Sequence, residues 1–189
     1  MIDYIKNRWK ADNGYKEVLI IAFPLIISTG SYSLQHIIDR IFLTWHSSEA
    51  IAASVPAGVL NFTIMSLFLG TAMYIGTFVA QYYGAHRYNM VGKIIWHGVV
   101  IAGIAALFHL MLVPFSGTIF SIIGHPVKIQ KLEVVYFKIL NYGSFFPIFS
   151  HVLSSFFSGR GITITVMWVN IVATIINIGL NYLLIFGFN

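Results

Sequence analysis

The sequence predicts an all-α integral membrane protein, and three observations support that fold class. The chain is 58% hydrophobic and only 9% charged, with a mean hydropathy of +0.82, whereas a soluble domain carries about 25% charged residues. Segments such as Val18-Leu-Ile-Ile-Ala-Phe lack the strict alternation of a barrel strand. Long stretches carry no Asp, Glu, Lys or Arg, and each reaches the roughly 20 residues that a helix needs to cross a bilayer. These stretches are 18–38, 50–86, 94–127, 139–159 and 161–189.

We predict two domains in sequence order, a polar lead-in and a transmembrane bundle. Residues 1–16 form an amphipathic cytoplasmic lead-in, because Trp9 and Tyr15 among lysines suit the headgroup region. Residues 17–189 form the bundle of about five helices. The predicted helices lie near 17–45, 54–83, 92–115, 134–157 and 162–186.

Polar and turn-forming residues separate these helices. The first loop is His46-Ser-Ser-Glu49, and the second is Tyr83–Asn89. Pro114 ends the third helix, and Gly124-His-Pro126 turns the loop that follows it. Ser158-Gly-Arg-Gly161 forms the last turn.

The distribution of basic residues predicts the orientation in the membrane. With the N-terminus in the cytoplasm, seven Lys and Arg residues lie in the inner segments and three in the outer ones, so the positive-inside rule favours this arrangement. The inner residues are Lys6, Arg8, Lys10, Lys16, Arg87, Lys93 and Arg160, and the outer ones are Lys128, Lys131 and Lys138.

Asp39 is the most informative residue of the first predicted helix, because residues 18–38 before it contain no charge. A charge at bilayer depth costs roughly 2.5–3.5 kcal/mol on insertion scales, so such a residue usually has a function. Tyr32, Gln35 and His36 precede it at helical spacing and share its face. This face can bind a proton or a small cation. Alternatively, Asp39 pairs with Arg40 or extends outward to water.

The fifth predicted helix carries one polar stripe in an otherwise apolar segment. Asn170, Thr174, Asn177 and Asn181 recur at i, i+4, i+7 and i+11. Their amide oxygens can line a cavity or coordinate an ion. Interhelical hydrogen bonding is an equally good interpretation of the stripe.

Two prolines and several small residues predict the shape and packing of the helices. Pro24 and Pro147 are expected to bend the first and fourth helices. Ala72 and Gly76 in the second helix and Gly98 and Ala102 in the third permit close helix approach. The lone His97 and His109 are expected to be hydrogen-bonded structural residues.

The residues that catalysis requires are missing, so we do not expect an enzyme. The chain has no cysteine, no H-E-x-x-H, no G-x-S-x-G and no P-loop. No cofactor is predicted, and no metal site beyond Na⁺ at Asp39. The net charge of +5 is spread over loops and ends, so no nucleic-acid partner is expected.

Several motifs in order resemble the multidrug and toxic compound extrusion (MATE) family over about residues 17–187. I-I-D-R-I-F-L is similar to the family's V-D-x-x-F-V-G, and E-A-I-A-A to its E-A-L-A-A. F-L-G-T-A-M-Y-I-G-T-F-V-A-Q-Y-Y-G-A resembles the family's second helix and inner loop. F-F-S-G-R-G-I-T and N-I-G-L-N-Y-L-L-I-F-G resemble its later turn and fifth helix.

The resemblance implies a secondary active antiporter that exports drugs or organic cations in exchange for Na⁺ or H⁺. MATE proteins have twelve helices in two bundles of six, so this chain matches most of one bundle. The family's helix-one aspartate matches Asp39 and its helix-five asparagine matches Asn177. The family's following acidic residue is Asn181 here, so the implied site has one negative charge rather than two.

The chain ends directly after the fifth predicted helix. We therefore expect a fragment, a truncated reading frame or a half-transporter whose partner is the missing C-terminal bundle, in a bacterial inner membrane. Two alternatives remain at this point. One is a lipid-linked oligosaccharide flippase of the same superfamily, although only Arg40 is embedded in a predicted helix. The other is a non-transporting membrane module.

Overall fold

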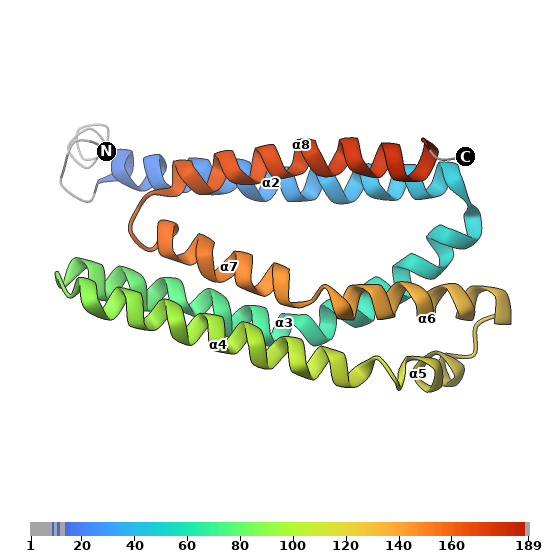
Figure 1. The fold of residues 1–189 in the computed structure, drawn as a ribbon. Coiled ribbons are helices and arrows are strands. Elements are labelled where there is room, and N and C mark those ends of the chain that lie inside the picture. Colours follow the sequence, from blue (N-terminus) through green and yellow to red (C-terminus); the bar gives the residue numbers. More distant parts are fainter. Residues whose placement is uncertain (1–8, 10, 12–13, 188–189) are drawn as a thin grey trace, which may run out of the picture. The chain divides into compact units, whose positions relative to one another are not determined.

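The computed structural model describes Trp9, Ala11 and residues 14–187, and this part of the chain contains helices and no strand. Most of the predicted lead-in, residues 1–8, 10 and 12–13, lies outside the described residues. The helices, labelled in Figure 1, are α2 (Tyr15–His46), α3 (Ser48–Gly84), α4 (Tyr88–Leu112), α5 (Ser116–Ile123), α6 (Val127–Tyr142), α7 (Phe145–Ser158) and α8 (Thr163–Phe186).

Four of these helices, α2, α3, α4 and α8, are long and apolar enough to cross a membrane, and α7 is a shorter apolar helix. The all-α membrane fold class is therefore confirmed. One region differs from the expectation, because the single helix predicted near 134–157 is two helices, α6 and α7. The short helix α5 was not predicted either.

The break between α6 and α7 lies at Gly143-Ser144, not at Pro147. Pro147 is the third residue of α7. A proline is tolerated in the first turn, where its missing N–H has no helical partner to lose. Instead of a bend in the middle of one longer helix, the structure has a complete interruption of the helix, three residues before the proline. Pro24, in contrast, lies inside α2, which continues through it as one helix.

The chain divides into two compact units, with the division inside α2. Residues 1–39 and 161–189 form unit 1, in which the first part of α2 and α8 are linked by side-chain hydrogen bonds. Residues 40–160 form unit 2.

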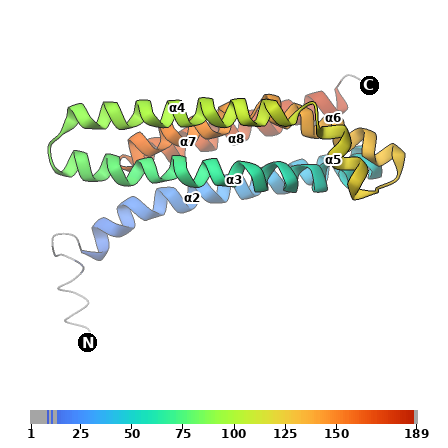
Figure 2. The same ribbon diagram turned by 90° about the horizontal axis from the view of Figure 1, so that it is seen from below.

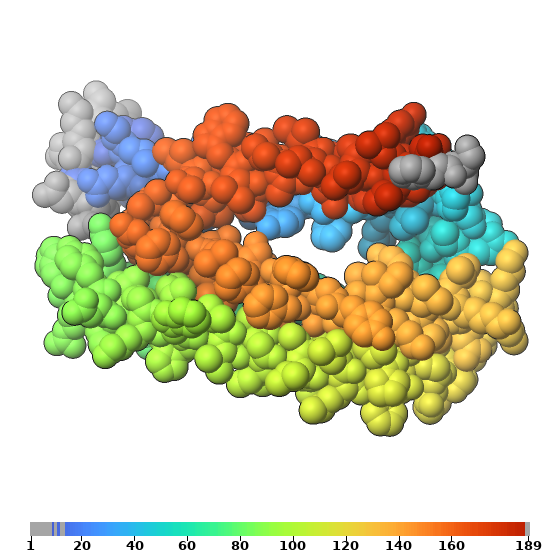
Figure 3. All heavy atoms as spheres, in the orientation of Figure 1, coloured from blue at the N-terminus to red at the C-terminus, as the bar shows by residue number. Residues whose placement is uncertain are grey.

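In unit 2, α3 and α4 form a long hairpin that packs against α7 and α6 (Figure 2). In the space-filling view, the yellow and orange residues of α5 and α6 cover one end of this unit, and the green α3–α4 turn forms the other (Figure 3).

The interior of unit 2 is built from small side chains in the middle and aromatic ones towards the α5–α6 end. Ala72, Ala102 and Ala105 are completely buried together with Ile148 and Val152. Nearer α5, Phe120 and Phe137 meet edge to face with ring centroids 5.5 Å apart, beside Ala57 of α3. The packing function expected of Ala72 and Ala102 is confirmed by this burial.

Two glycines mark the closest helix approaches in unit 2. A Cβ atom on Gly98 of α4 would lie 2.6 Å from Val152 Cγ1 of α7. A Cβ atom on Gly159 would lie 2.7 Å from the backbone oxygen of Gly76 in α3. Only glycine fits at these contacts, so α7 packs directly on the α3–α4 hairpin.

Both lone histidines of α4 are hydrogen-bonded, as predicted. His109 is fully buried, and its Nδ1 lies 2.7 Å from Asn141 Oδ1 of α6. The Asn141 amide donates to Phe137 O, so its oxygen faces the ring and the histidine Nδ1 is the donor. His97 Nδ1 lies 2.7 Å from Lys93 O one turn earlier in the same helix.

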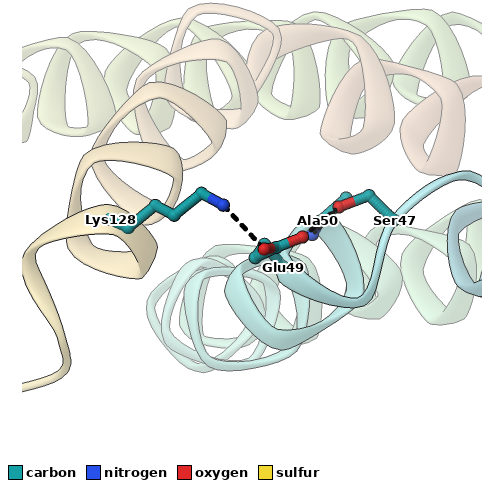
Figure 4. A network of polar contacts seen from close by, with 4 residues as sticks. All are labelled: Ser47, Glu49, Ala50 and Lys128. Carbon is teal, nitrogen blue, oxygen red and sulfur yellow. Dashed lines mark hydrogen bonds and ion pairs between the residues drawn. The ribbon is translucent and has the colours of Figure 1, made fainter.

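A polar network fixes the start of α3 to α6 (Figure 4). The Ser47 side chain caps α3 by accepting from Ala50 N at 3.2 Å, and it donates to Glu49 Oε2 at 2.9 Å. Lys128 Nζ of α6 donates to Glu49 Oε1 at 2.7 Å. The uncharged part of α3 begins at Ala50, so this network lies at the polar end of the helix.

The Gly98 contact predicts a position-specific loss of stability. Gly98→Ala should lower the free energy of unfolding by about 1–3 kcal/mol, because overpacking forces α4 away from Val152. Gly103→Ala is the matched control, since Gly103 lies in the same helix with nothing within 4 Å of its added Cβ. Thermal unfolding in detergent measures both variants, and equal stabilities would contradict the packing described here.

The Lys128 contact predicts the titration of Glu49. Hydrogen bonds from Lys128 and Ser47 lower the pKa of Glu49 from 4.5 to about 2. Because the folded-state pKa is the lower one, the contact stabilises the fold above about pH 4.5 and is lost as the pH falls towards 2. Lys128→Met should raise this pKa towards 4.5, measured by carboxyl ¹³C NMR. Lys131→Met serves as the control, and it should leave the Glu49 titration unchanged.

Candidate cation-binding site

Asp39 is held by a side chain of α8. Its half-buried carboxylate accepts a hydrogen bond at 2.6 Å from Nδ2 of Asn181. The two residues are 142 positions apart, so the bond exists only because α2 and α8 lie together in unit 1. Among the described residues no ion pair joins Asp39 to Arg40, so the alternative that the two residues neutralise each other is not what the structure shows.

The Asn181 amide bridges two oxygen atoms. Besides its bond to Asp39, Nδ2 donates to Asn177 Oδ1 at 3.0 Å. The electropositive N–H₂ group therefore lies between a carboxylate oxygen and an amide oxygen. These are the ligand types that hard cations prefer, and the amide hydrogens occupy the place between them.

A second polar contact lies farther along the same stripe of α8. Asn170 Oδ1 accepts from the Tyr32 hydroxyl at 3.2 Å, and its Nδ2 donates to Ser28 Oγ. Asn170 is buried, as is Thr174 between the two contacts. The stripe predicted from spacing thus faces α2 at both of its ends.

The other predicted residues of α2 differ in their environments. Gln35 is half-buried and His36 is exposed, and neither shares in these hydrogen bonds. Ser28, which sequence reasoning missed, is buried and bonded to Asn170. Its spacing of four to Tyr32 and eleven to Asp39 is the signal that places it on the same face.

Chemically, the site combines the Asp39 carboxylate, the amide oxygen of Asn177 and the amide of Asn181, whose Nδ2 faces both of these oxygens. This set can hold a single small cation or a proton.

Comparison with models of protein families identifies the family of this chain. The MatE family model matches residues 24–183, which is most of the sequence. The chain belongs to the MatE family. The resemblance inferred from the motifs of α2, α3 and α8 is confirmed by this match, and MatE proteins are transporters rather than enzymes.

Curated relatives cover the same region. A probable multidrug resistance protein NorM of Burkholderia pseudomallei is 25% identical over 170 residues, and one of Bacillus cereus is 28% identical over 176 residues. These alignments include 88% and 91% of this chain but only 36% and 38% of the relatives. The chain therefore spans little more than a third of the length of these relatives.

Solved structures share the fold. An outward-facing multidrug resistance MATE family transporter of the MOP superfamily superposes with a TM-score of 0.84 at 20% identity, covering 91% of this chain and 38% of that one. A MOP superfamily transporter from Pyrococcus furiosus gives 0.81 at 18% identity, with the same coverage. At these identities the likeness shows the fold.

The Asn170 contact predicts a measurable contribution to α2–α8 pairing. Asn170→Leu removes two interhelical hydrogen bonds, each worth on the order of 0.6 kcal/mol in a membrane, and should destabilise the protein by about 1 kcal/mol. Val172→Leu, on an exposed part of α8, is the control. Unfolding in mixed micelles measures both variants, and an unchanged Asn170→Leu protein would refute the pairing function.

Proposed function

We propose that this chain forms part of a secondary active antiporter that exports hydrophobic organic cations in exchange for Na⁺ or H⁺. Membership of the MatE family and relatives named as multidrug resistance proteins support the transport class. The observation that carries the coupling site is the hydrogen bond from Asn181 to Asp39. Because the chain spans about a third of its relatives, the activity belongs to the whole transporter.

The coupling site consists of Asp39, Asn177 and Asn181. Asp39 supplies the charge that attracts a cation, and the two asparagines supply neutral oxygen ligands. With an amide at position 181, the site holds one negative charge, which matches one Na⁺ or one H⁺ for each cycle.

Rotation of one amide converts the site between two forms. In the observed form, Asn181 donates through Nδ2 to both Asp39 Oδ1 and Asn177 Oδ1. A Na⁺ ion between these oxygens displaces the N–H₂ group, and a half-turn of the amide then presents Asn181 Oδ1 as a third ligand. A proton on Asp39 has the same effect, since the carboxyl O–H then needs an acceptor and the turned amide provides one.

Ion occupancy acts on the shape of α2 through this change. In the observed form Asn181 links α8 to α2 at Asp39, and Asn170 links them at Ser28 and Tyr32. Pro24, one turn before Ser28, removes a backbone hydrogen bond and makes that part of α2 the easiest to bend. Loss of the Asn181 bond lets α2 bend there, which reshapes the bundle and releases the exported cation.

The lipid-linked oligosaccharide flippase is a weaker candidate. A pyrophosphate ligand requires several cationic side chains, and the relatives reported above are named for multidrug resistance.

We place the protein in the bacterial inner membrane, with its N-terminus in the cytoplasm and the remaining bundle as its partner.

The first test replaces the proposed charge. In the full-length transporter, Asp39→Asn should abolish efflux of a fluorescent organic cation driven by an imposed Na⁺ or pH gradient, because the site keeps its shape and loses its charge. Efflux from proteoliposomes with one gradient at a time identifies the ion. Glu49→Gln changes an acid outside the site and should transport normally. Gradient-driven efflux by the Asp39→Asn transporter would contradict the proposal.

The second test adds a charge to the same site. Asn181→Asp places a second carboxylate beside Asp39, so the two groups repel unless a cation binds between them. We expect tighter binding of the coupling ion and slower turnover, measured as a lower half-saturating ion concentration and a lower maximal efflux rate. An Asn181→Asp transporter with wild-type ion dependence would show that residue 181 does not contact the ion.

A further inference from the structure

Unit 2 contains a buried acid that the proposed transport site does not use. Glu133 of α6 has no exposed side-chain surface, and of the acidic residues that the structure describes it is the one that is completely buried. One turn later on α6, Phe137 packs against Phe120 of α5 and Ala57 of α3. The carboxyl group therefore lies next to an apolar core.

Glu133 has one polar contact and one unused oxygen. Its Oε1 lies 2.6 Å from Nδ1 of His125, a residue of the turn between α5 and α6. Its Oε2 is buried without a hydrogen-bond partner in the described part of the chain. The His125 side chain is 40% exposed and lines an open depression of about 680 Å³ together with apolar residues of α3 such as Val55 and Val59. The pair thus connects a buried acid to an accessible ring.

The number of bound protons determines whether the His125–Glu133 pair is electrically neutral. With neutral His125 donating from Nδ1, an ionised Glu133 leaves a net negative charge in the protein interior with one oxygen unbonded, which is costly. One added proton neutralises the pair, either as imidazolium with carboxylate or as imidazole with carboxyl. The proton reaches the pair from water through the exposed part of the ring.

The other charged groups near Glu133 are already engaged or lie elsewhere. On α3, Glu49 accepts from Lys128. On α4, His109 is bonded through Nδ1 to Asn141, two turns along α6 from Glu133, and its Nε2 is buried without a partner in the described part of the chain. The described α5 carries no titratable side chain. On α6 itself, Lys131 is exposed and Lys138 is half-buried, and His125 is the group that contacts the carboxylate.

We propose that Glu133 and His125 form a proton-binding site, separate from Asp39, that fastens the α5–α6 turn to unit 2. His125 lies between Gly124, which has a positive φ of 81°, and Pro126, the residue that caps α6. The His125–Glu133 bond joins this turn to the buried face of α6. When the proton leaves, the buried carboxylate carries an uncompensated charge that is more stable in contact with water. The His125–Glu133 bond then weakens, and the turn opens beside the depression on α3.

The experiment follows the site in the full-length transporter in lipid nanodiscs. Hydrogen–deuterium exchange of peptides covering residues 116–137, corrected for the chemical exchange rate, is measured between about pH 5 and 9. Wild type should exchange several-fold faster at the high end. Glu133→Gln, which keeps size and hydrogen bonding, should abolish this pH response.

Two further measurements keep the outcome decisive. Asp39→Asn should retain the full pH response, since it lies in unit 1 and affects only the proposed coupling site. Infrared pH-difference spectra of wild type labelled with ¹³C-glutamate and ¹⁵N-histidine should show a protonation change at the pair, which requires no variant to fold. A pH response that persists in Glu133→Gln, or the absence of any protonation change in the labelled wild type, would overturn the proposal.

Discussion

The absence of water from the bilayer core is the constraint on which this structure depends. Every backbone N–H and C=O group in hydrocarbon must be paired within the protein, and a helix pairs them locally. Side-chain polar groups face the same demand, and some of the buried ones meet it between helices, as Asn170 does with Ser28 and Tyr32 and His109 Nδ1 does with Asn141. Polar residues such as these therefore mark where helices meet.

Asp39 and Glu133 illustrate two different solutions for a carboxylate in such an interior. Asp39 receives its hydrogen bond from an amide, which cannot neutralise charge, and so leaves an electrostatic attraction for a cation. Glu133 contacts an imidazole, and we propose that this pair binds the proton that neutralises its charge. The first arrangement supports the proposed coupling site, and the second supports the proposed proton-binding site.

Close packing supports the units that carry these groups. Helices in lipid gain little from hydrophobic burial and associate through contact and hydrogen bonding, so small residues matter at their crossings. Gly98 and Gly159 let α7 rest directly on the α3–α4 hairpin, where any side chain would collide with Val152 or with the backbone of Gly76. The network of Ser47, Glu49 and Lys128 fixes the other end of α3 to α6. A rigid hairpin of this kind gives the α5–α6 turn a fixed surface on which to fasten.

By itself, the sequence determined the helical membrane fold, the family and the faces of α2 and α8 that carry Asp39 and the asparagines, because uncharged length and helical spacing are local properties of the chain. It did not reveal that the fourth segment is interrupted at Gly143-Ser144, nor that Ser28 accepts a hydrogen bond from Asn170. Pairings such as Asn181 with Asp39 and the burial of Glu133 beside His125 were decided only by the tertiary structure. They join residues on separate elements, and which side chain faces which partner depends on how helices pack, a property that spacing along one helix does not contain.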